Sequence, residues 1–183
     1  MSLFMDLMEV AYEATCTALG IDYKANPQNI RPLNYTDSPA ALNKPDEDLA
    51  YYLVEFGDSP LNRQIDVEYG KFGDKTAEKK THRCRNIRII WQTYGGNGFE
   101  NADKIRERLF DDDIREIFRS AGMSLVTDVP EPVFIPELLG TQWYKRYDLY
   151  ADFNQLVTEN KEIDLAASAR VVVKTDEGIE EEC

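Results

Sequence analysis

Apolar residues recur every three or four positions in two parts of the chain, and this spacing predicts helices. The first part is residues 3–19, where a wide apolar stripe needs a partner surface that buries it. The second part is residues 99–121, which follow the glycine-rich turn 95–98. Its apolar spacing slips near Asp111, so we expect a kink or a break into two helices there.

Alternating or short apolar runs predict the strands. They cover residues 50–56, 63–70, 86–94, 123–129, 143–157 and 168–174. In the third run, Ile87, Ile89 and Trp91 share one face. In the 143–157 run, the shared apolar face holds Trp143, Tyr147, Leu149, Ala151 and Phe153. Because most strands are sequence neighbours, we expect an α+β fold: a mixed or antiparallel β-sheet with helices packed on one face and a long hairpin or loop arm.

The remaining segments predict how the chain is organised. We expect a single domain over residues 1–175, in which segment 21–49 is irregular because it holds four prolines and no periodicity. Residues 57–85 are expected to form a flexible hairpin, and the part from 70 to 85 is expected to be its loop or mobile tip. The acidic residues 176–183 are expected to be a disordered tail.

Charge and residue usage exclude several classes of function. The 183-residue chain holds 34 acidic and 21 basic residues, a net charge of -13, which disfavours binding to nucleic acid phosphate or anionic lipid. His82 is the single histidine and the three cysteines lie far apart, so the usual triads and zinc patterns are missing. We therefore expect no enzyme activity, catalytic residue, cofactor or metal, no membrane partner, and reduced thiols.

The turn Tyr94-Gly95-Gly96-Asn97 joins a predicted strand to the second helix. A glycine-rich turn at a helix N-terminus can bind phosphate, but the Walker and dinucleotide patterns are both missing. We expect a structural turn. Asn97 and Glu100 have the spacing of a capping box, in which Glu100 reaches back to the N–H of Asn97.

Two stretches are candidates for contact with a partner. The first is basic and holds Lys71, Lys75, Lys79, Lys80 and Arg83. It is either a solvated hairpin or a docking arm that folds onto the acidic face of a neighbouring subunit. The second comprises the proline-bounded loop 130–140 and the polar face of the long strand, with Phe134, Leu138, Tyr144, Arg146, Asp148 and Tyr150. Arg146 forms either a cross-strand salt bridge or an interface anchor.

The order of these motifs resembles the neck or tail-terminator proteins of tailed bacteriophages. The matching features are a Tyr-Gly-x-Asn turn before a helix with an early alanine, and then a Trp-x-x-Arg-x-Asp strand. They are Tyr94, Gly95, Asn97, Ala102, Trp143, Arg146 and Asp148. The family often has proline after the glycine and alanine after the asparagine, where this chain has Gly96 and Gly98. The resemblance covers roughly residues 50–157.

The resemblance implies a structural virion protein of the tail or neck. Such a protein ends tail-tube polymerisation and joins the tail to the head connector, as a homo-hexameric ring assembled in the host cytoplasm. It implies tail-tube protein and connector or other neck proteins as partners, with genomic DNA passing through the ring unbound. The alternative that the composition supports is a monomeric acidic binding protein, either a phage-encoded inhibitor or a DNA mimic.

Overall fold

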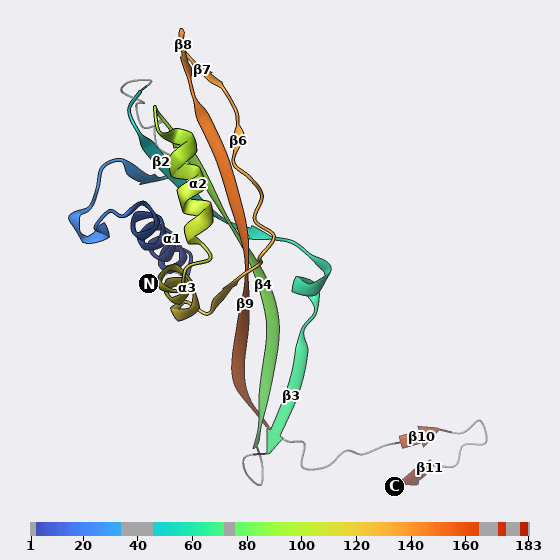
Figure 1. Ribbon diagram of the computed structural model, residues 1–183. Coiled ribbons are helices and arrows are strands. Elements are labelled where there is room, and N and C mark those ends of the chain that lie inside the picture. Colours follow the sequence, from blue (N-terminus) through green and yellow to red (C-terminus); the bar gives the residue numbers. More distant parts are fainter. Residues whose placement is uncertain (1–2, 34–45, 72–75, 165–171, 175–179, 183) are drawn as a thin grey trace. The chain divides into compact units, whose positions relative to one another are not determined.

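The computed structural model of the chain describes residues 3–33, 46–71, 76–164, 172–174 and 180–182 (Figure 1). The chain divides into two compact units. Unit 1 holds Met1–Gln64 and Cys84–Leu156, and unit 2 holds Ile65–Arg83 and Val157–Cys183. The single domain expected over residues 1–175 stays a prediction.

The α-helices of the described chain lie in unit 1, where the apolar spacing predicts them. Helix α1 spans Leu3–Leu19, α2 spans Gly98–Arg108 and α3 spans Asp112–Ser120. The break predicted near Asp111 is confirmed, because Asp111 is the N-cap residue of α3. The acidic first turn of α3 suits the positive end of its helix dipole.

The main sheet has seven strands in a mixed arrangement, which confirms the α+β class. Its central path is β1-β2-β4-β9-β5, with β3 paired to β4 and β6 paired to β9. The strands are β1 (Ile30–Pro32), β2 (Leu49–Gly57), β3 (Asp66–Lys71), β4 (Thr76–Tyr94), β5 (Met123–Leu125), β6 (Val133–Phe134) and β9 (Arg146–Asp164). Strand β1 is parallel to β2, while β2 and β3 pair antiparallel with β4.

The core of unit 1 lies between the helices and the sheet, and α1, α2 and α3 cover one side of that sheet (Figure 1). Its central buried residues include Ile87, Ile89 and Trp91 of β4 and Leu149, Ala151 and Phe153 of β9. Trp91 donates its indole N–H to Thr15 Oγ1 of α1 at 2.8 Å. The apolar face predicted for residues 86–94 therefore lies in the core, and so do Leu149, Ala151 and Phe153 of the face predicted for residues 143–157.

The expected loop at residues 70–85 is wrong for most of its length. Strand β4 already begins at Thr76, and its first half pairs with β3 in a regular antiparallel register from Asp66↔His82 to Lys71↔Ala77. The charged run has no apolar alternation, so its strand character comes from backbone pairing rather than from a buried face. Residues 72–75 lie outside the described residues.

The predicted 143–157 strand is two strands. Strand β8 (Gln142–Tyr144) pairs with β7 (Glu137–Leu139) in a separate two-stranded sheet, and β9 runs on to Asp164. Trp143 is therefore 63% exposed instead of continuing the buried face of β9.

Short elements also occur where none was predicted. The irregular segment 21–49 contains the 3₁₀ helix η1 (Tyr23–Ala25) and strand β1, and a second 3₁₀ helix, η2, spans Pro60–Arg63. The predicted final strand, 168–174, is described only as β10 (Val172–Lys174). Within the acidic tail, β11 (Glu180–Glu182) pairs antiparallel with β10.

Candidate functional site

The turn predicted from the sequence is held by Asp48, a residue that no local sequence pattern marks. The backbone N–H of Asn97 donates to Asp48 Oδ1 at 2.9 Å, and the Asn97 side-chain amide donates to Asp48 Oδ2 at 2.6 Å. The predicted capping box is therefore wrong, because the N–H that Glu100 was expected to accept is bound by Asp48. Asp48 directly precedes Leu49, which pairs with Tyr94, so strand pairing places the carboxylate beside the turn.

Gly95 permits this approach. Its φ is +102°, and a Cβ atom there would lie 2.7 Å from both the Cα of Asp48 and the carbonyl oxygen of Glu47. Only glycine fits such backbone geometry without displacement of the neighbouring strand. The neighbouring Gly96 has no atom within 4 Å of a Cβ position. A side chain at position 95 would therefore clash with Glu47 and Asp48, whereas one at position 96 would not.

The turn and the predicted Arg146–Asp148 strand meet in one polar network. Tyr94 donates its hydroxyl to Glu137 Oε2 at 2.7 Å, and Arg146 Nη1 lies 3.6 Å from the same oxygen. Arg146 also donates from Nε and Nη2 to the two carboxylate oxygens of Asp148, each at 2.6 Å. Residues from β4, β7 and β9 are thus tied together at one place.

Burial strengthens this network. The side chains of Arg146 and Asp148 are 20% and 22% exposed, and the bidentate pair raises the pKa of Arg146. Burial, followed by the hydrogen bond to Glu137, raises the pKa of Tyr94 well above its ordinary value. Arg146 therefore keeps its charge and Tyr94 keeps its proton at neutral pH, so their contacts form a fixed tie between strands. Of the two roles predicted for Arg146, the cross-strand salt bridge is present as the 3.6 Å contact with Glu137 of β7, while the shorter pair with Asp148 lies within β9.

The predicted contact residues beside the network differ in exposure. Tyr144 is buried, packed with Leu49, Tyr51 and Tyr94 in a second apolar cluster. Tyr150 is 41% exposed, and the guanidinium of Arg88 lies 4.4 Å from the centre of its ring. Tyr144 therefore supports the network from inside, whereas Tyr150 remains on the surface.

The proline-bounded segment and the adjoining strand β8 carry several exposed apolar side chains. We call Val133, Phe134, Ile135, Leu138, Leu139 and Trp143 the apolar ribbon; their exposed fractions run from 39% to 63%. Phe134 packs against Tyr147 with ring centres 5.2 Å apart, and β7 is held to the sheet through Glu137. The ribbon is therefore exposed and apolar, and contacts of Phe134 and Glu137 hold it to the sheet.

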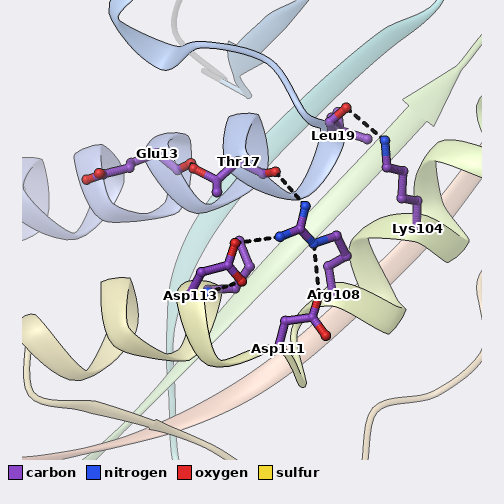
Figure 2. A network of polar contacts seen from close by, with 8 residues as sticks. Glu13, Thr17, Leu19, Lys104, Arg108, Asp111 and Asp113 are labelled. Atoms are coloured by element: carbon purple, nitrogen blue, oxygen red, sulfur yellow. Dashed lines mark hydrogen bonds and ion pairs between the residues drawn. The ribbon is translucent and has the colours of Figure 1, made fainter.

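The helix that follows the turn is also fixed in place. Figure 2 shows Lys104 and Arg108 of α2 reaching the last carbonyl groups of α1: Lys104 Nζ donates to Leu19 O at 2.9 Å, and Arg108 Nη1 donates to Thr17 O at 3.3 Å. Arg108 also pairs with Asp111 and Asp113. Helix α1 has no basic residue in its last turn. Lys104 and Arg108 therefore provide the positive charges that stabilise the negative, C-terminal end of its helix dipole.

The basic candidates belong to unit 2. Arg83 lies 3.7 Å from a Glu159 carboxylate oxygen, and Lys80 lies 3.4 Å from Glu78. Lys79 is half-buried beside β9. Lys75 lies outside the described residues, and the side chain of Lys71 is not described. The predicted basic stretch is therefore a paired strand with cations on it.

Within the described ranges, no three His, Cys, Asp or Glu side chains gather closely enough to hold a metal ion. Cys16 and Cys84 are free thiols, and Cys183 lies outside the described part of the chain. None of the described helices has the length and apolar run needed to cross a membrane.

Comparison with known proteins bears on this arrangement. A search of curated proteins finds no match for the chain. A family model described as phage neck terminator protein matches residues 6–178, which includes the turn, the network, the apolar ribbon and both long strands. The resemblance predicted from the sequence is confirmed. The chain belongs to the phage neck terminator protein family and is a structural protein of the phage neck.

Proposed function

We propose that this protein caps the tail tube and joins it to the head connector as a ring, built of six copies, through which the genome passes. The observation that carries the proposal is the apolar ribbon in a chain of the phage neck terminator family. Assembly takes place in the host cytoplasm, and the finished ring is a part of the virion neck.

The exposure of the ribbon supports a protein partner. Six large apolar side chains lie between positions 133 and 143, and each is at least 39% exposed. Exposed apolar side chains gathered in one short stretch of chain are typical of interaction sites, since the core of an interface is more apolar than ordinary surface. Phe134 and Leu138 are the predicted contact residues within it, and each is about half exposed, at 52% and 51%.

The network beneath the ribbon supports a preformed contact surface. Glu137 lies in the middle of the ribbon and accepts from Tyr94 while it faces Arg146. Because β7 is held by this partly buried network, little ordering cost remains when a partner binds. We propose that Arg146 and Asp148 act in assembly by positioning the ribbon, while Tyr150 lies at its margin.

The charge of the chain supports passage of DNA. A net charge of -13 favours an acidic surface around the opening that the proposed ring encloses. Such a surface repels the phosphate backbone, so the duplex moves through without being held.

The test is the mass of the purified full-length protein by light scattering across concentration, with negative-stain images, alone and after addition of tail-tube protein. A ring of about six subunits with a duplex-sized hole supports the proposal. A strict monomer that also ignores the tube overturns it and favours the monomeric acidic binding protein.

A matched pair of variants locates the contact. Leu138→Glu places a charge in the ribbon, whereas Leu156→Glu changes a 70% exposed leucine outside it. We expect Leu138→Glu, but not Leu156→Glu, to abolish assembly or tube capping, because burying an unpaired carboxylate in an apolar contact is costly. Equal effects of the two changes would show that the ribbon is not the contact.

A further inference from the structure

One face of the unit 2 sheet combines apolar side chains with cations. Paired residues of antiparallel strands lie on the same face, so Val67 joins Thr81 and Tyr69 joins Lys79. Ile65 and Arg83 line a hollow with Thr81, and β9 completes this face with Val157, Glu159 and Lys161. We call these nine residues the hairpin face.

The hairpin face is open and hollowed. Ile65, Val67 and Tyr69 are 59%, 41% and 67% exposed. Two adjoining hollows, of about 320 and 580 Å³, share Thr81 and Glu159 in their walls. Three exposed apolar side chains next to a concave surface are the arrangement expected of a docking site for an extended segment.

The charge of this face is opposite to that of the whole chain. It holds three cations, Lys79, Arg83 and Lys161, against one carboxylate, Glu159, which lies 3.7 Å from Arg83. Among the described residues, Lys79 and Lys161 form no ion pair, although the chain carries a net charge of -13. The opposite face differs, since Glu68 lies near His82 and Glu78 near Lys80. The hairpin face is thus suited to a segment that is both acidic and apolar.

The chain itself contains such a segment. Residues 176–182, with the sequence DEGIEEE, hold five carboxylates, one isoleucine and no cation. Residues 176–179 lie outside the described residues, and Glu180–Glu182 form β11. We call residues 176–182 the acidic segment.

We propose that the hairpin face binds the acidic segment of a second copy of this chain, through Lys79, Lys161 and the apolar side chains of Ile65, Val67 and Tyr69. The inference rests on the proposed ring, in which each subunit must present two different, complementary surfaces to its neighbours. Opposite charges orient the contact and speed encounter, while Ile65, Val67 and Tyr69 supply the apolar area that holds it.

Charge reversal tests the contact in the full-length protein. One variant carries Lys79→Glu and Lys161→Glu, and the other carries Glu180→Lys, Glu181→Lys and Glu182→Lys. Each variant by itself gives the hairpin face and the acidic segment charges of the same sign. We therefore expect self-association, measured by light scattering at low salt, to weaken about tenfold or more. A variant that combines both sets is expected to assemble again.

Matched controls separate this effect from net charge. Lys24→Glu with Lys145→Glu changes exposed lysines of unit 1 by the same amount as the lysine variant. Glu9→Lys, Glu55→Lys and Glu107→Lys match the glutamate variant, since all three glutamates are exposed residues of unit 1. Both controls are expected to assemble as the unaltered protein does.

Mixing distinguishes a second copy from the same chain. In a ring of alternating variants, every hairpin face meets an acidic segment of opposite charge, so an equimolar mixture is expected to assemble. If the acidic segment binds its own hairpin face, the mixture fails and only the combined variant is restored, which overturns the proposal.

The remaining outcomes are also decisive. Rings that form normally from every charge variant overturn this inference and leave the proposed function standing. An unaltered protein that stays monomeric, alone and with tail-tube protein, overturns both.

Discussion

The two halves of β4 have the same secondary structure and opposite burial. In residues 84–94, within unit 1, Ile87, Ile89 and Trp91 are fully buried. In residues 76–83, within unit 2, Ala77 is the only buried residue. Strand β9 repeats this difference, since its buried residues end at Gln155. Strand pairing and core formation are therefore separate properties of one continuous strand.

The difference identifies where each half obtains its stability. The unit 1 half is covered by helices and gains from apolar burial. The unit 2 half is held by backbone pairing and by exposed side-chain contacts. Both contribute little to the free energy of folding, because water competes for the same groups. We infer that unit 1 holds most of the free energy of folding and that unit 2 is available for assembly.

The largest expected effect comes from the buried side of this comparison. Phe153 is fully buried, and its ring centre lies 4.3 Å from that of Phe118. Phe153→Ala leaves a cavity and is expected to lower the free energy of unfolding by about 3–5 kcal/mol, measured by urea denaturation. Tyr69→Ala in unit 2 removes a 67% exposed ring and is expected to cost about 0.5 kcal/mol or less. Equal losses would contradict the division of stability between the units.

The end of the buried half gives the next effect. Gly95→Ala forces a Cβ to within 2.7 Å of backbone atoms at a φ of +102°, so we expect a loss of about 2–3 kcal/mol. Gly96→Ala in the same turn meets nothing within 4 Å and is expected to be nearly neutral. Denaturation curves of the two variants check this. A tolerated Gly95→Ala would show that Asp48 does not fix the turn.

The same comparison explains what the sequence could predict. Ile87, Ile89 and Trp91 alternate because one face of that half is buried, so periodicity revealed both the strand and its core face. The half from 76 to 83 has Ala77 as its one buried residue, so no apolar alternation marks it in the sequence. Its charged residues therefore predicted a loop, although the backbone pairs regularly with β3.

The candidate site was predicted only where its residues lie in recognisable motifs. Tyr94, Arg146 and Asp148 belong to a turn and a strand with clear patterns, and the structure joins Tyr94 to Arg146 through Glu137. Asp48 and Glu137 were missed, since each acts through a contact far away in sequence and neither lies in a local pattern. Their signal is tertiary: strand pairing brings Asp48 to the turn, and β7 brings Glu137 to Tyr94.

A smaller effect depends on pH and again concerns the buried half of β4. Tyr52 pairs with Trp91 across β2 and β4, and burial raises its pKa to about 12. Because the unfolded chain loses this proton near pH 10 and the folded chain holds it longer, stability is full below pH 10 and falls as pH rises toward 12. Tyr52→Phe is expected to remove about 1.4 kcal/mol of that loss at pH 11. Denaturation at pH 9, 10 and 11 measures it, and parallel curves for the two proteins would contradict the burial of Tyr52.

The smallest effect compares an ion pair from each unit. Arg146 and Asp148 form a bidentate pair with side chains 20% and 22% exposed, so Arg146→Gln leaves a poorly solvated carboxylate and is expected to cost about 1 kcal/mol. Arg83 and Glu159 are 46% and 70% exposed at 3.7 Å, and Arg83→Gln is expected to change stability by about 0.3 kcal/mol or less. Added salt should weaken only the second pair, because screening acts on exposed charges. If Arg83→Gln nevertheless weakens self-association, the exposed pair is used in assembly, and the two units differ in role as well as in burial.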